Sequence, residues 1–259
     1  MKIHIHTDLE GVSGIDRMEQ VGPDGADDRA ACEKLMGDLN AAVAGAFDGG
    51  ATHVTVLDSH AGGGNFILDL LDDRAANDTR PNKKWWGLLD DSYDGAFFIG
   101  AHPMAGTING FLDHTQSSRH WFDYSINGRS MGELAQWAIH AGNFGVPLLM
   151  VSGDEAACAE ARAFFDPVET AAVKQGLCRN RAQAYPLEEA RRRIHDAAER
   201  AMGLLGKARP LRPICPMDIR LTWTRADFCD ACMARWPDAE RLDARTARRV
   251  SNNYLDVLF

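Results

Sequence analysis

The chain opens with the stretch KIHIHTDLEG, residues 2–11, which predicts a strand followed by two carboxylates. The strand covers Lys2–Thr7, and Asp8 and Glu10 follow it two residues apart. Because side chains of extended backbone alternate in direction, both carboxylates point to one side and can address one metal ion or an adjacent pair. Gly11 then lets the backbone turn sharply away. Taken alone, the string is equally typical of a solvated acidic turn.

Three further apolar strands are predicted downstream, over residues 52–57, 95–100 and 146–152. Each ends shortly before a polar side chain: His60, His102 and Asp154, respectively. Helical patterns alternate with the strands, the longest over residues 26–47 and 187–205. This alternation predicts an α/β protein with a mostly parallel sheet that is covered by helices.

The polar side chains at these strand ends are expected to meet. In open parallel sheets, ligands bind outside the carboxyl ends of the strands. Four separate strands would bring polar groups to that edge, and these groups are Asp8, Glu10, His60, His102 and Asp154. This convergence is the main sign of an active site in the sequence.

The C-terminal part of the chain has a different pattern. Residues 206–216 contain three prolines and are typical of a linker. A strand over 217–224 and helices over 226–235 and 250–259 follow. We therefore expect two units, a metal-binding α/β catalytic domain at residues 1–205 and a smaller α/β unit at residues 206–259.

Composition excludes several classes of partner. The 259 residues carry a net charge of -9, which disfavours binding to a nucleic-acid backbone or an anionic membrane. No apolar run approaches the ~20 residues of a membrane span. The first residues lead directly into a strand without a signal-peptide pattern, so the cytoplasm is the expected compartment.

Six cysteines are scattered along the chain, which argues against a disulfide framework. Cys229 and Cys232 have the spacing of a metal or redox motif. A structural zinc site needs a second pair of ligands, so we expect two reduced thiols on one helix.

The remaining candidates supply metal-binding chemistry. His60 ends a strand beside Asp58, which could orient its ring. His102 lies between Gly100 and Pro103 in a constrained loop, and Glu133 lies near a helix start, where it could equally serve the helix dipole. Three carboxylates and two imidazoles match two zinc ions with one open edge: Asp8, Glu10, His60, His102 and Glu133.

The ordered set of motifs resembles the zinc-dependent D-aminopeptidases of the dipeptide-operon type. The matching pieces are Asp8-Leu9-Glu10-Gly11-Val12-Ser13-Gly14, Asp58-Ser59-His60, Gly100-Ala101-His102, His114, Ile126-Asn127-Gly128-Arg129 with Gly132-Glu133, Val146-Pro147 through Val151-Ser152-Gly153-Asp154, and Ala172-Val173-Lys174-Gln175. The likeness covers about residues 1 to 200 and fades in the tail.

By this resemblance, Asp8 bridges two zinc ions, and Glu10, His60, His102 and Glu133 complete the pair, although other divalent metals could replace zinc. His114 is then the catalytic histidine, acting as nucleophile or general base. The resemblance further implies removal of N-terminal D-residues from short peptides by a homo-oligomer, a decameric ring. Lys174 and Asp154 are candidates for the pocket.

One residue departs from the family pattern, which has a small Ser two positions before the first carboxylate where this chain has His6. His6 could orient a metal ligand, form an altered pocket wall or pack structurally. The departure, with the aromatic residues Trp85, Trp86, Trp121 and Phe122, leaves open an amidohydrolase that acts on a non-peptide amide or lactam metabolite. A non-catalytic metal-dependent assembly module and a two-metal phosphatase are further alternatives.

Overall fold

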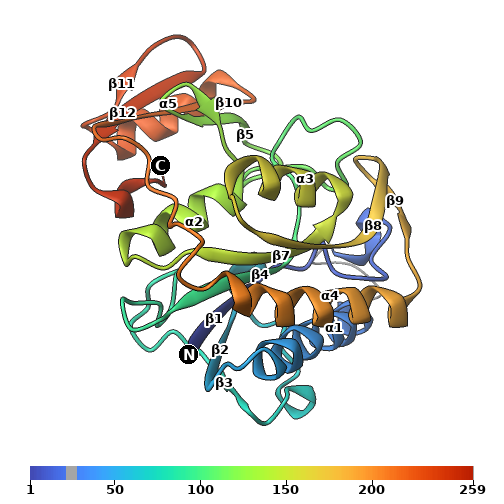
Figure 1. The fold of residues 1–259 in the computed structure, drawn as a ribbon. Helices are drawn as coiled ribbons and strands as arrows, with labels where there is room; N and C mark the ends of the chain where they lie inside the picture. Colours follow the sequence, from blue (N-terminus) through green and yellow to red (C-terminus); the bar gives the residue numbers. More distant parts are fainter. Residues whose placement is uncertain (22–27, 259) are drawn as a thin grey trace.

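The computed structural model describes residues 1–21 and 28–258, which form two sheets with flanking helices (Figure 1). The predicted start of the first helix, Ala26 and Asp27, lies outside the described residues, as does Phe259. No helix of the described part is long and apolar enough to cross a membrane.

The larger sheet has seven strands: β1 (Lys2–Thr7), β2 (His53–Asp58), β3 (Ala75–Asn77), β4 (Gly95–Ala101), β7 (Leu148–Asp154), β8 (Glu169–Cys178) and β9 (Arg181–Ala184). Their order is β3-β2-β1-β4-β7-β8-β9. Every neighbouring pair is parallel except β8 and β9, which form an antiparallel hairpin. The predicted α/β class with a mostly parallel sheet is confirmed.

Helices cover both faces of this sheet, as Figure 1 shows: α1 (Asp28–Asp48) and α4 (Leu187–Ala201) on one face, α2 (Glu133–Asn143) and α3 (Glu155–Phe164) on the other. Strand β4 demonstrates the division, because Phe97 and Ile99 join the core under α1 and α4. The alternate residues Ala96 and Phe98 join the core under α2 and α3. Burial on both faces explains why the central strands are almost continuously apolar.

The smaller sheet is antiparallel and lies at one end of the molecule (Figure 1). It contains β5 (Trp121–Ile126), β6 (Arg129–Ser130), β10 (Met217–Trp223), β11 (Glu240–Arg241) and β12 (Thr246–Ser251), in the order β11-β12-β10-β5-β6. Helix α5 (Ala226–Arg235) packs against β10 and β12. Positive φ angles at Asn127 and Gly128 form the tight turn between β5 and β6, as is typical of an Asn-Gly pair in a hairpin.

The smaller sheet draws strands from both sides of the predicted boundary between residues 205 and 206. Strands β5 and β6 precede that boundary, and β10 pairs directly with β5. The division of the chain into 1–205 and 206–259 stays a prediction.

The helix predicted over residues 250–259 is wrong within the described residues. Val250 and Ser251 belong to β12, because their backbone pairs with Asp218 and Met217 of β10. Only a short 3-10 turn at Tyr254–Asp256 follows. The other short 3-10 segments are Met18–Gln20, His60–Gly62, Leu68–Leu70 and Met202–Leu204.

The two neighbouring cysteines lie where the sequence predicted them. Cys229 and Cys232 are both on α5, both are buried, and neither forms a disulfide. Burial raises the pKa of the Cys232 thiol to about 11, so it stays protonated and unreactive at neutral pH.

Candidate functional site

Four of the predicted site residues follow strands of the larger sheet. Asp8 and Glu10 come after β1, His60 begins a 3-10 turn after β2, and His102 follows β4. Because β1, β2 and β4 are adjacent and parallel, their carboxyl ends meet at one edge. This edge is where the sequence placed them.

The other two predicted residues reach the edge from outside the sheet. Glu133 is the first residue of α2, and His114 lies in the long connection between β4 and β5. A pocket of about 220 Å³, hereafter the acidic pocket, is lined by His6, Asp8, Glu10, Ser59, His60, Ala61, His114, Gln116 and Glu133. His102 is almost fully buried beside it.

Two glycines allow β1 and β4 to touch at the site. A Cβ atom on Gly100, whose φ is 80°, would lie 2.1 Å from the carbonyl oxygen of Asp8. A Cβ atom on Gly11 would lie 2.1 Å from the carbonyl oxygen of Ala101. Gly11 is therefore required for close approach rather than for the sharp turn that the sequence suggested. This contact brings Asp8 next to His102.

The site residues form two donor groups. The first donor group is Asp8, Glu10 and His60, whose ligand atoms lie within 4.8 Å of one another. His60 Nδ1 lies 2.9 Å from Asp8 Oδ1 and 3.0 Å from Glu10 Oε2. One imidazole thus faces two carboxylates.

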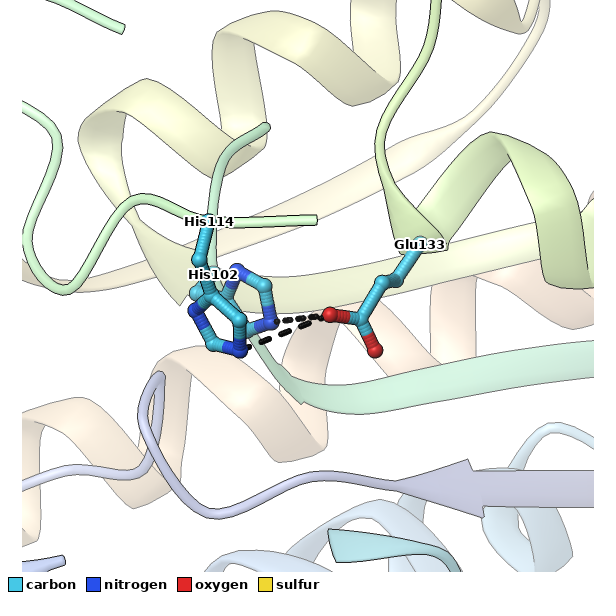
Figure 2. A group of neighbouring side chains, drawn as sticks. All are labelled: His102, His114 and Glu133. Carbon is cyan, nitrogen blue, oxygen red and sulfur yellow. Dashed lines mark ion pairs between the residues drawn. The ribbon is translucent and has the colours of Figure 1, made fainter. Parts of the chain in front are cut away.

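The second donor group is His102, His114 and Glu133, with the same limit of 4.8 Å between ligand atoms. Figure 2 shows both imidazoles directed at the Glu133 carboxylate. The Nε2 atoms of His102 and His114 lie 3.3 Å and 3.4 Å from Glu133 Oε1. The two rings stack with their centroids 3.8 Å apart and their planes 10° from parallel.

Asp8 connects the two groups. Its Oδ1 faces His60 in the first group, while its Oδ2 lies 3.4 Å from His102 Nε2 in the second. A single carboxylate therefore presents one oxygen to each group, which is the geometry of a bridging ligand.

Backbone carbonyls orient the histidines of the second donor group. His102 Nδ1 lies 3.1 Å from the Pro103 carbonyl oxygen, and His114 Nδ1 lies 2.7 Å from that of Leu112. A carbonyl can only accept, so each Nδ1 donates. In the neutral form of each ring, Nε2 then carries the lone pair, and this is the atom that a metal would bind.

The charges at the site are strongly coupled. Burial alone opposes the charged form of His60, yet the charge of Glu10 and the hydrogen bonds with Asp8 and Glu10 raise the pKa of His60 to about 11. Burial likewise opposes ionisation of Glu10, but His60 holds the pKa of that carboxyl well below its usual range. Imidazolium charge thus balances the buried carboxylates, a role that a divalent cation can take over by displacing the protons.

The residues fit a metal. His102 Nε2 is buried, faces oxygens of Asp8 and Glu133, and has no hydrogen-bond partner among the described residues. A buried polar nitrogen without a hydrogen-bond partner is costly, and a cation between it and the two carboxylates would satisfy it. Carboxylate and imidazole donors with a pocket on one side suit zinc with an open coordination position.

Asp58 does not orient His60, contrary to the expectation from the sequence. Its carboxylate accepts hydrogen bonds from the backbone of Gly64, Asn65 and Phe66. Asn65 in turn donates through Nδ2 to the His60 carbonyl at 2.9 Å. The glycine-rich loop after β2 therefore folds back on Asp58 and fixes the backbone of His60, a role that the sequence gave no signal for.

Lys174 and Asp154 do not line the acidic pocket, in contrast to their predicted role. Lys174 is fully buried, and its Nζ donates to the carbonyls of Glu10 and Ile15 at 2.6 Å each. Asp154 caps α3 through Ala157 N and also accepts from Phe111 N at 2.9 Å. Both residues hold the loops that carry site residues.

Glu160 and Gln116 support the site but went unrecognised in the sequence. Glu160 on α3 is buried and accepts from Met104 N at 2.7 Å, which fixes the loop after His102. Gln116 donates its backbone N–H to Glu133 Oε1 at 2.6 Å and lines the acidic pocket. Neither belongs to a motif with a recognisable spacing.

His6 forms a wall of the acidic pocket and is also packed against aromatic rings. Its Nδ1 lies 3.2 Å from Ser59 Oγ, and its ring centroid lies 4.6 Å from that of Phe98 and 4.8 Å from that of Trp137. The imidazole is therefore held in place as part of the pocket wall.

Three comparisons with known proteins give consistent results. The model of the D-aminopeptidase family matches residues 1–259. A D-aminopeptidase of Bacillus subtilis (strain 168) is 34% identical over 218 residues, which are 82% of this chain and 78% of that protein. The solved Zn-dependent D-aminopeptidase DppA from Bacillus subtilis, described as a self-compartmentalizing protease, matches with a TM-score of 0.90 and 28% identity over 99% of this chain and 94% of that one.

Proposed function

The chain belongs to the D-aminopeptidase family, and from this membership we propose that it is a dinuclear zinc aminopeptidase that releases N-terminal D-amino acids from short peptides. The observation that carries the proposal is the position of Asp8, with one carboxylate oxygen at each donor group. The Zn-dependent solved relative supports zinc as the metal.

In this proposal, Asp8 would supply one carboxylate oxygen to each of two ions. Glu10 and His60 would complete the ligands of the first ion, and His102 and Glu133 those of the second. Bound zinc polarises a carbonyl oxygen and lowers the pKa of coordinated water from about 15.7 towards about 7. The protein's own part is to hold five ligands rigidly and to keep one side open to the acidic pocket.

His114 is the proposed catalytic residue. Its Nδ1 donates to Leu112 O, which leaves the Nε2 lone pair free to accept a proton. Nε2 faces Glu133 (Figure 2), and His114 lines the acidic pocket. In that tautomer, Nε2 can take a proton from the attacking water as a general base, or attack the carbonyl carbon itself. Since Nε2 lies 4.0 Å from Glu10 Oε1, the same carboxylate can receive the substrate ammonium beside it.

We also propose that the chain works as a homo-oligomer, a decameric ring, in the cytoplasm. The self-compartmentalizing solved relative supports assembly. Size-exclusion chromatography with light scattering tests it, and a monomer at working concentration would contradict it.

The test of the function combines metal content with activity. Purified chain reconstituted with zinc should bind two ions per chain and hydrolyse D-alanyl-D-alanine faster than L-alanyl-L-alanine. One bound ion would reject the dinuclear site, and a preference for the L-peptide would reject the stereochemistry.

His6 in the pocket wall favours one alternative, an amidohydrolase that acts on a non-peptide amide or lactam. Hydrolysis of such amides together with failure on every D-peptide, with both ions bound, would support it.

A His114→Ala variant separates catalysis from metal binding. If His114 is catalytic, the variant keeps two zinc ions and loses about a hundredfold or more in kcat. Because His114 also lies within the second donor group, loss of one ion would instead make it a ligand. Wild-type turnover with both ions bound would remove His114 from the mechanism.

A further inference from the structure

A second, larger pocket adjoins the acidic pocket. It encloses about 580 Å³ against about 220 Å³, and His114 lines both. Its walls come from the loop around Gly106, from the tip of the β8–β9 hairpin and from strands β5 and β10 of the smaller sheet. A peptide bond held beside His114 would therefore have one side in each pocket.

A cation is fixed on the wall of this second pocket. Arg179, at the tip of the β8–β9 hairpin, has a side chain that is 42% exposed and lies 3.4 Å through Nε from Asp113 Oδ1. Asp113 is itself held, because its Oδ2 accepts from Gly106 N at 2.6 Å. The guanidinium is thus oriented by a carboxylate on the same wall.

The backbone of Arg179 is linked to the proposed catalytic histidine. The Arg179 carbonyl accepts from Leu112 N at 2.7 Å, and the Leu112 carbonyl accepts from His114 Nδ1 at 2.7 Å. Two consecutive hydrogen bonds therefore fix the distance between the hairpin tip and the reacting centre. Such rigidity is what a site that measures the length of a short substrate requires.

The rest of the wall is amphipathic. Trp121 and Phe122 from β5 supply aromatic surface, and Phe122 is 60% exposed. Thr222 and Thr224 supply hydroxyls from the β10 side. Flat aromatic faces and hydroxyls suit a peptide backbone and small side chains of either polarity.

The two pockets differ in the charges that they present. The acidic pocket holds the proposed metal ligands Asp8, Glu10 and Glu133, so it would receive the amino-terminal residue and the scissile carbonyl of a substrate. The second pocket has the guanidinium of Arg179 beside the carboxylates of Asp113 and Asp123, and the planar donors of that guanidinium match a carboxylate. A short peptide with free ends places its own carboxylate on this leaving-group side.

We propose, on the basis of the function proposed above, that the second pocket binds the leaving-group side of the peptide and that Arg179 receives its C-terminal carboxylate. The enzyme is then selective for short peptides with a free carboxyl end. Peptides without that charge are poorer substrates.

The test compares D-alanyl-D-alanine with its C-terminal amide, using the zinc-loaded chain of 259 residues. In the wild type, kcat/KM for the free acid should exceed that for the amide by about tenfold or more, the value of one charge-assisted hydrogen-bonded pair. In Arg179→Gln, this ratio should fall to near one, chiefly through a higher KM for the acid. Arg179→Lys should restore part of it.

Arg192→Gln is the matched control, because Arg192 is an exposed, ion-paired arginine on α4 outside both pockets. It should leave the acid-to-amide ratio at the wild-type value. An unchanged ratio in Arg179→Gln, or a wild type that does not distinguish acid from amide, overturns the inference while the proposed function stands. Failure of the wild type on both peptides overturns the proposed function and this inference with it.

Discussion

The two sheets of this molecule contribute to the site in different ways. In the parallel sheet, β1, β2 and β4 all end at one edge, so each can place a buried ligand there. In the antiparallel sheet, β5 and β10 run in opposite directions, so their carboxyl ends lie at opposite ends of the sheet. These two strand ends therefore cannot bring ligands together. They offer a face instead, on which Asp123 and Thr222 lie directly opposite each other and line the second pocket.

The difference separates the two proposed roles, with metal binding at the parallel sheet and peptide recognition at the antiparallel sheet. Convergent strand ends give short, buried distances between charged groups, as metal binding requires. A sheet face gives a broad and partly exposed surface, as recognition of a peptide requires. The predictions below test whether the two regions are separable in this way.

The largest expected effect is the removal of the ligand shared by both donor groups. Asp8→Asn should lose both zinc ions and at least about a hundredfold in kcat, because even residues that merely orient ligands contribute 10–100-fold. Glu133→Gln, which touches only the second group, should keep one ion. Metal analysis by mass spectrometry and steady-state kinetics measure both effects.

Asp123→Asn on the smaller sheet is the matched control for metal content. It should keep both ions, since Asp123 lies in the second pocket and outside both donor groups. Loss of metal from Asp123→Asn, or two ions retained in Asp8→Asn, would break the separation between the sheets.

A smaller effect on zinc affinity is expected from replacing Lys174, which supports the loop that follows β1. Lys174 ties the carbonyls of Glu10 and Ile15 together from within the core, and burial lowers the pKa of its amine to about 7. Lys174→Met removes both hydrogen bonds and should weaken zinc binding about 10–100-fold. Competition with a chromophoric chelator measures the affinity.

Lys207→Met provides the comparison, because the Lys207 Nζ also donates to a backbone carbonyl, that of Gly203, but at the surface. Its zinc affinity should equal that of the wild type. Equal affinities in all three proteins would mean that Lys174 contributes only to packing.

The smallest effect concerns stability of the antiparallel sheet in acid. Hydrogen bonds from Arg220, with a further contribution from Arg248, lower the pKa of Asp218 on β10 from its ordinary 3.8 to about 2. A lowered pKa stabilises the fold above about pH 4, and this contribution disappears as the pH falls towards 2. Asp218→Asn should therefore cost up to about 1 kcal/mol at pH 6 and almost nothing near pH 2.

Urea denaturation across that pH range measures the difference. In Asp227→Asn on α5, only the exposed ion pair with Arg225 is removed. The loss of unfolding free energy in this variant should depend less on pH than the loss in Asp218→Asn. If Asp218→Asn lowered the free energy of unfolding equally at pH 6 and at pH 2, the Asp218 charge would not stabilise the fold through Arg220 and Arg248.

Much of this molecule could be predicted from the sequence because the signals are local. Apolar strands that are followed by Asp8, His60 and His102 indicate a parallel sheet with polar groups at the carboxyl ends of its strands. This signal does not depend on the other parts of the sequence. The five proposed ligands and His114 do lie together at that edge. The helix expected over 250–259 failed because its pattern was weak and β10 offered backbone hydrogen bonds to the same residues.

The amino-acid sequence by itself indicated the five proposed ligands and His114, since side-chain type and strand periodicity are properties of a few neighbouring residues. Only the tertiary structure decided how those groups pair: that Asp8 contacts both His60 and His102, that Lys174 holds the Glu10 loop, and that Arg179 shares a pocket wall with β5 and β10. Each of these contacts joins residues far apart in the chain. They are set by the packing of whole elements, which no local pattern encodes.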